Sequence, residues 1–143
     1  MNNFQFNARH YIAIVDKGED GFGVVFPDLP GCVAMGETVD EALSHAREAL
    51  QDWAASFIAR TGGMVPARSL NDLLNDPDVV EDISAGVMVT VVPYIAELAR
   101  SVKANLSIDA GILASIDAAA ERLNITRSAT VELLARRGLA ELV

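Results

Sequence analysis

An alternating run followed by two helical segments constrains this chain more than any other feature. Along residues 102–108, apolar and polar side chains alternate, as in a strand with one face toward a core. Asp109 and Thr126 then precede two amphipathic helices that extend to residue 139. A unit of about 40 residues cannot enclose a core, and its single strand lacks a partner. Two copies that pair their strands antiparallel and interlock their helices remove both deficits, so the sequence predicts a homodimer.

The faces of this unit can be assigned from its periodicity. The apolar residues of the strand and of both helices are expected to face inward. They are Val102, Ala104, Leu106, Ile108, Ile112, Ile116, Ala120, Leu123, Val131, Leu134, Ala135 and Leu139. The opposite face of the strand carries Lys103, Asn105 and Ser107.

A two-stranded ribbon of this kind fits the major groove of DNA, where lysine, asparagine and serine hydrogen-bond to base edges. The second helix begins with Thr126, Arg127 and Ser128. Its N–H groups, cation and hydroxyls suit a backbone phosphate. We therefore expect DNA binding by the three polar strand residues and these three helix residues. The alternative is that the strand and helical hairpin serve dimerisation alone.

The stretch KANLSIDAGILASIDAAAERLNITRSATVELLARRG resembles the ribbon-helix-helix repressor family. The alternating strand, the two helix lengths and the TRS sequence that enters the second helix carry this resemblance. It implies that residues 102–143 form a dimerisation and DNA-binding domain that binds a palindromic operator. The implied base readers are Lys103, Asn105 and Ser107, and the implied phosphate clamp is Arg127 with Ser128.

The residues before this unit predict a small antiparallel sheet. Apolar runs at 10–16 and 22–26 flank a Gly-containing turn, which is the pattern of a hairpin, and 32–35 forms a short third strand. Residues 87–92 are apolar on both faces, which favours a strand inside the sheet, with Pro93 closing it.

Helices are predicted between the third and fourth strands. Thr38 and Glu41 form a capping box before a long amphipathic helix over about 38–60, which ends at Gly62-Gly63. Ser69 and Asp76 begin two shorter helices. The fold class is therefore α+β: a small antiparallel sheet with a long helix on one face, followed by the ribbon-helix-helix domain.

The segment Phe26-Pro27-Asp28-Leu29-Pro30-Gly31-Cys32, followed by Gly36, Thr38 and Glu41-Ala42, resembles the HicB antitoxin family over residues 10 to about 95. That family joins a partial RNase H-like domain to a ribbon-helix-helix or helix-turn-helix module. The resemblance implies that residues 1–95 form a toxin-binding domain. Its implied partner is a small basic HicA-like toxin, an mRNA-cleaving endoribonuclease with a catalytic histidine. The chain would neutralise that toxin by direct binding and repress its own operon. Self-association of the N-terminal domains would give a tetramer.

The charge distribution agrees with two separate tasks. Residues 1–100 carry six lysines and arginines against fifteen aspartates and glutamates, whereas residues 101–143 carry five of each. The acidic part suits a basic protein partner. The neutral part leaves DNA contact to locally placed cations, so affinity should depend on two or more dimers binding together.

Composition also indicates where such a chain works. A hydrophobic content of 51% and a charged content of 22% are typical of a soluble globular protein. No apolar run approaches the ~20 residues of a membrane helix, and the first residues lack a secretory signal. A lone Cys32 fits a reducing cytoplasm.

Two other classes of function stay open. An RNase H-like hydrolase needs several carboxylates converging on metal ions. Asp16, Glu41, Glu48 and Asp52 are the available acids, but the later strand supplies none, and the last two lie on the polar side of their helix. We therefore expect no catalytic site, no metal and no cofactor. The other class is a stand-alone ribbon-helix-helix regulator whose N-terminal domain senses a ligand or a protein.

The remaining notable residues have structural interpretations. The FPDLPG segment is interpreted as a turn that sets strand direction, with direct partner contact by Asp28 or Leu29 as the alternative. Cys32 is expected to be a small buried hydrophobe rather than a nucleophile. Trp53 and Phe57, four residues apart on the long helix, are expected in the core.

Overall fold

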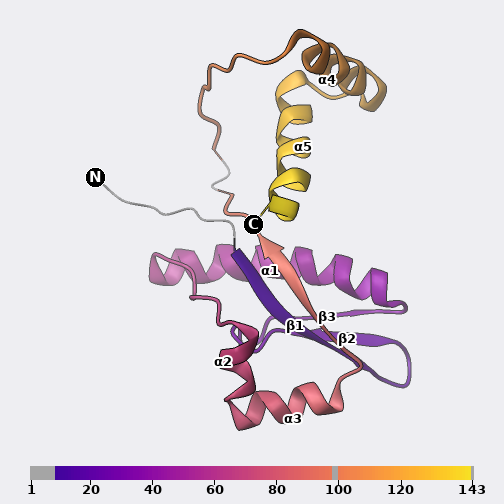
Figure 1. The fold of residues 1–143 in the computed structure, drawn as a ribbon, viewed down its shortest axis with the longest axis vertical. Coiled ribbons are helices and arrows are strands. Elements are labelled where there is room, and N and C mark those ends of the chain that lie inside the picture. The colour runs from indigo at the N-terminus through magenta and orange to yellow at the C-terminus, as the bar shows by residue number, and fades with distance from the viewer. Residues whose placement is uncertain (1–8, 98–99, 143) are drawn as a thin grey trace. The chain divides into compact units, whose positions relative to one another are not determined.

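The computed structural model describes residues 9–97 and 100–142. The chain divides into two compact units, Arg9–Tyr94 and a second that contains Ile95–Val143. We call them the N-terminal unit and the C-terminal unit. Figure 1 shows the elements of both.

The N-terminal unit is built on a four-stranded antiparallel sheet in the order β3-β2-β1-β4. Its strands are β1 (Arg9–Lys17), β2 (Phe22–Val25), β3 (Val33–Gly36) and β4 (Met88–Tyr94). A turn closed by the Gly18 N–H on the Gly21 carbonyl, at 2.8 Å, joins β1 to β2. The predicted antiparallel sheet and its first hairpin are confirmed.

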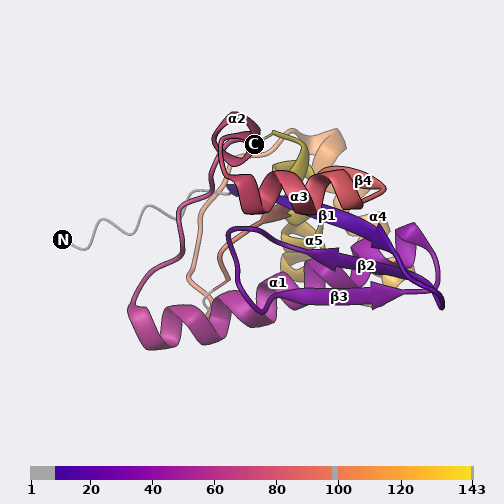
Figure 2. The same ribbon diagram turned by 90° about the horizontal axis from the view of Figure 1, so that it is seen from below.

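Helices lie on both faces of this sheet, as Figure 2 shows. Helix α1 (Val39–Thr61) covers one face with Ala42, Ala46, Leu50 and Ala54 buried. Helices α2 (Leu70–Leu74) and α3 (Pro77–Ala85) lie on the other. There the core cluster consists of Ile12, Ile14, Leu73 and Val79. The expectation of a helix on one face was incomplete, because the short helices form a second layer.

Strand β1 is the strand buried from both sides, since every residue from Tyr11 to Val15 is buried. The prediction of an interior position for residues 87–92 was wrong. β4 pairs with β1 alone and is an edge strand, with Val91 55% exposed. Pro93 lies inside β4 opposite His10, and an edge strand tolerates a residue without an N–H.

The predicted helix starts are confirmed, with one change at α1. The Thr38 hydroxyl accepts the Glu41 N–H at 3.1 Å, as a capping box requires. The Glu41 carboxylate, however, accepts from the Glu37 N–H at 3.0 Å rather than from Thr38. At the other end Gly62, with φ 84°, ends the helix in the left-handed conformation.

The C-terminal unit contains two helices, α4 (Ala110–Leu123) and α5 (Arg127–Leu142). The carboxylate of Asp109 accepts from Gly111 and Ile112 N–H groups, so it caps α4 as predicted. Asn124 ends α4 in the left-handed conformation and starts the turn into α5. Ile116, Ala120 and Thr130 are buried where the two helices meet. In the part of the chain that the structure describes, no helix is long and apolar enough to cross a membrane.

Gly36 sets how closely β3 approaches α1. A Cβ at this position would lie 2.4 Å from the backbone nitrogen of Ala42 and 2.8 Å from its Cα. Because the obstacle is helix backbone, Gly36→Ala should lower the free energy of unfolding by about 2 kcal/mol. Urea denaturation measures this change. Gly63→Ala is the matched control, since a Cβ there meets nothing within 4 Å, and equal midpoints for the two variants would contradict the prediction.

Candidate functional site

The FPDLPGC segment, residues 26–32, is a double turn folded into the N-terminal unit. Leu29 N–H donates to the Phe26 carbonyl at 3.1 Å, and Cys32 N–H donates to the Leu29 carbonyl at 3.0 Å. Phe26, Leu29 and Cys32 are buried. The interpretation of this segment as a turn is therefore confirmed.

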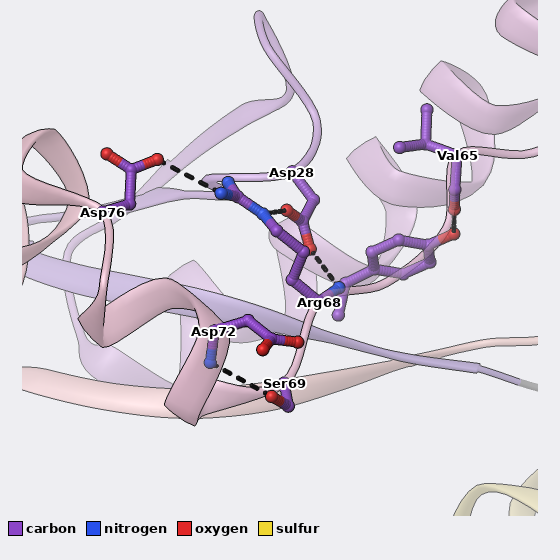
Figure 3. Close-up of polar contacts among 7 residues, drawn as sticks. Asp28, Val65, Arg68, Ser69, Asp72 and Asp76 are labelled. Carbon is purple, nitrogen blue, oxygen red and sulfur yellow. Dashed lines mark hydrogen bonds and ion pairs between the residues drawn. The ribbon is translucent and has the colours of Figure 1, made fainter.

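An ion pair between a buried aspartate and a partly exposed arginine holds this turn from the side of the loop between α1 and α2. Asp28, whose side chain is 4% exposed, accepts from the Arg68 backbone N–H at 2.8 Å and from its Nε at 2.6 Å. Arg68 Nη1 also donates to Asp76 at 3.1 Å (Figure 3). These hydrogen bonds raise the pKa of Arg68 and lower that of Asp76 from their ordinary values. One arginine thus joins the turn to the N-cap of α3.

Neighbouring contacts hold the same loop and turn. The carbonyl of Val65 accepts hydrogen bonds from the Tyr11 hydroxyl and from Arg9 Nη1. On the other side, Trp53 Nε1 donates to the Pro30 carbonyl at 3.1 Å. Trp53 also stacks on Phe57, with ring centroids 4.7 Å apart. Both rings are half-buried, so they support the turn at the edge of the core rather than at its centre.

These contacts bear on whether Asp28 and Leu29 serve the turn or contact a partner directly. Leu29 is fully buried, and the Asp28 carboxylate is occupied by Arg68. Both side chains are satisfied within the unit, which favours the interpretation of a structural turn over direct partner contact. Sequence reasoning did not single out Arg68. The signal was present, however, because it is the only lysine or arginine between Arg60 and Arg100.

Neither Cys32 nor the four acidic residues considered for a hydrolase are arranged for catalysis. Burial raises the pKa of the Cys32 thiol to about 11, so very little thiolate forms near neutral pH. Among the residues that the structure describes, no three histidine, cysteine, aspartate or glutamate side chains gather to hold a metal ion. Asp16, Glu41, Glu48 and Asp52 are exposed and do not converge.

All six residues predicted to bind DNA are exposed on the C-terminal unit: Lys103, Asn105, Ser107, Thr126, Arg127 and Ser128. The first three lie in residues 101–109, which pair with no strand among the residues that the structure describes. The ribbon requires a second copy, so the strand pairing stays a prediction. The Thr126 hydroxyl accepts the Ala129 N–H at 3.1 Å and caps α5.

Arg127 is already engaged within the chain. Its Nε donates to Asp117 Oδ1 at 2.7 Å, and its Nη2 donates to Asp117 Oδ2 at 2.8 Å. This pair lowers the pKa of Asp117 and raises that of Arg127. Arg136 likewise pairs with Glu97 at 2.6 Å and with Glu132 at 3.6 Å. Sequence reasoning missed Asp117, whose partner lies ten residues further along the chain.

The C-terminal unit exposes many large apolar side chains. Val102 is 78% exposed and Leu106 is 69% exposed. The other large exposed apolar residues of this unit are Ile108, Ile112, Leu123, Ile125, Leu134, Leu139 and Leu142. The inward positions predicted for Leu134, Ala135 and Leu139 are not buried in one chain, because α4 and α5 bury few side chains against each other. Large apolar side chains left exposed in one chain are candidates for burial against a partner.

Comparison with known proteins identifies the family. The family described as "HicB_like antitoxin of bacterial toxin-antitoxin system" matches residues 11–136. The match spans most of both units, and the chain therefore belongs to the HicB-like antitoxin family. The resemblance predicted from the FPDLPGC segment is confirmed. As a member of an antitoxin family, the chain is not an enzyme.

The chain is also similar to individual proteins. A protein of Haemophilus phage HP1, "Uncharacterized 14.9 kDa protein in rep-hol intergenic region", is 27% identical over 107 residues, which are 75% of this chain and 78% of the phage protein. The crystal structure of antitoxin HicB3 has a TM-score of 0.51 and 25% identity, and covers 91% of this chain and 97% of that one. The antitoxin HicB of Burkholderia pseudomallei has a TM-score of 0.47 and 25% identity, with coverage of 94% and 99%.

The Asp28–Arg68 pair makes a direct prediction about stability. Arg68→Ala should lower the free energy of unfolding by about 2–3 kcal/mol, because the buried Asp28 carboxylate would lose its cation and one hydrogen bond. Urea denaturation of the purified protein checks this value. Arg47→Ala, which removes an exposed arginine from α1, should change stability by less than about 0.5 kcal/mol. A loss no larger than this control would show that the pair does not hold the turn.

Proposed function

We propose that this antitoxin performs two tasks with two parts of its chain. Residues 1–95 bind and neutralise a small basic, HicA-like toxin that cleaves mRNA. Residues 102–143 form a ribbon-helix-helix dimer that binds a palindromic operator and represses the operon. The observation that carries the proposal is membership in the HicB-like antitoxin family over both units.

The charge of the N-terminal unit supports a basic partner. Fourteen of the twenty acidic residues of the chain lie within this unit, Arg9–Tyr94, against five lysines and arginines. On α1 the carboxylates of Asp40, Glu48 and Asp52 are exposed, with no ion pair to any described residue. Complementary charge of this kind accelerates encounter and selects partners. Inhibition would then be steric and electrostatic: the antitoxin covers the catalytic histidine of the toxin or blocks its RNA-binding surface.

The exposed apolar surface of the C-terminal unit supports the dimer. Val102, Leu106 and Ile108 lie on the predicted inner face of the strand and are exposed in one chain. Pairing the strands of two copies would give their backbone groups partners and cover these side chains. The outer face of the ribbon would then present Lys103 and Asn105 to the major groove. If the N-terminal units also self-associate, a tetramer places two ribbons on adjacent half-sites.

Co-expression tests the antitoxin task. The neighbouring reading frame is expected to encode a basic protein of roughly 60–80 residues whose growth arrest this chain relieves. Deleting residues 102–143 should abolish operator binding and leave capture of that protein intact in a pull-down. Loss of capture by a folded truncated chain would contradict the division of tasks. Normal growth with the neighbouring protein alone would favour a stand-alone regulator instead.

Base reading by the ribbon makes a separate prediction. Asn105→Ala should weaken operator binding by ~1–3 kcal/mol and relax specificity at one base position, because asparagine bonds adenine through two hydrogen bonds. Fluorescence anisotropy with a set of single-base operator variants measures both effects. Asn71→Ala, at an exposed asparagine of α2, is the control. An operator affinity equal to that of the control would show that the ribbon face is assigned incorrectly.

A further inference from the structure

The Arg127–Asp117 pair lies at the start of α5, where the proposed phosphate contact would form. Both hydrogen bonds are short, at 2.7 and 2.8 Å, and together they occupy Nε and Nη2 of the guanidinium. The two side chains are 59% and 44% exposed, so the pair is accessible to solvent and to a ligand. A carboxylate and a phosphate use the same paired N–H donors of arginine.

Few cations are available within residues 101–143, so the state of Arg127 has a large effect on the charge of this segment. Residues 101–143 contain five lysines and arginines. Arg127 and Arg136 are in ion pairs, whereas Lys103, Arg122 and Arg137 have none with any described residue. An arginine neutralised by a carboxylate adds no net attraction to a polyanion. Two of the five cations are therefore already compensated within the chain.

We propose that Asp117 is an internal competitor of DNA phosphate: it holds Arg127 and thereby lowers the affinity of the antitoxin for DNA of any sequence. This inference rests on the proposed DNA-binding function and adds a residue that limits its strength. A phosphate must displace the Asp117 carboxylate from the Nε–Nη2 edge, or bind the other edge of the guanidinium against its negative charge. Either route makes binding weaker than that of an unpaired arginine.

The consequence concerns how the operator is occupied. Each dimer would contain two restrained arginines, so the electrostatic contribution of a single dimer to DNA binding would be small. Stable occupancy would then require two dimers on adjacent half-sites, where the affinities combine. Asp117 would in this way make repression depend on assembly of the antitoxin.

The experiment compares the full-length wild type with Asp117→Asn, Arg127→Ala and the double variant. Fluorescence anisotropy measures binding to a duplex from upstream of its own gene and to a scrambled duplex of equal length, from about 50 to 300 mM salt. Asp117→Asn should bind both duplexes about 3–10-fold more tightly at the lowest salt. The slope of log K against log salt should be steeper by about 1–2 for the dimer, as expected for one added phosphate contact per chain.

The double variant separates this mechanism from a general charge effect. In the Arg127→Ala background, Asp117→Asn should have no effect on DNA binding, because the Asp117 carboxylate then has no arginine to pair with. Glu121→Gln removes another carboxylate from α4 and is the matched control, since Glu121 has no ion pair with a described residue. Its smaller effect on binding should be the same with or without Arg127.

Three outcomes overturn the proposal. Competition is ruled out if Asp117→Asn binds no more tightly than the wild type while its dimer mass and melting temperature are unchanged. If Asp117→Asn still tightens binding in the Arg127→Ala background, the effect arises from net charge rather than from competition. Binding of neither duplex by any variant at the lowest salt rejects the DNA-binding function itself. If Asp117→Asn does not fold, Asp117→Ala replaces it: alanine removes the carboxylate and is a strong helix former, and binding no tighter than wild type would reject competition.

Discussion

A buried carboxylate with one arginine as its partner determines the arrangement of the N-terminal unit. Asp28 lies within the turn between β2 and β3, and Arg68 lies forty residues further along, after the long helix. A buried aspartate without a cation is strongly unfavourable. The turn and the loop must therefore come together, and Arg68 then reaches Asp76 at the start of α3. The second helical layer is positioned by the same contact that fixes the turn.

This contact gives a physical reason for the sequence FPDLPGC. Phe26 and Leu29 fill the core, Asp28 takes the ion pair, and the Pro30 carbonyl accepts from Trp53 of α1. The segment is recognisable in sequence because several of its positions have structural requirements at once. These requirements are structural, because the side chains of Asp28 and Leu29 are buried within the unit.

Local features were predictable from the sequence, and long-range ones were not. The caps at Thr38, Ser69, Asp76 and Asp109 depend on residues two or three positions apart, and all four are confirmed. The position of β4 at the edge depends on strand order, which an apolar run does not specify. The pairs Asp28–Arg68 and Asp117–Arg127 join residues forty and ten positions apart. Each acid has many possible partners in sequence, and only the fold selects one.

The two units of the chain differ in how far they satisfy their own side chains. The N-terminal unit satisfies its own buried groups, since no buried side-chain nitrogen or oxygen among the described residues lacks a hydrogen bond. The C-terminal unit leaves Val102, Leu106 and a row of helix residues in solvent. What this unit leaves unsatisfied is exposed apolar area rather than charge. Burial of such area provides the main driving force for association. In the proposed dimer the hydrophobic effect would favour association, and compensation of Arg127 by Asp117 would leave the proposed affinity for DNA dependent on how many dimers assemble.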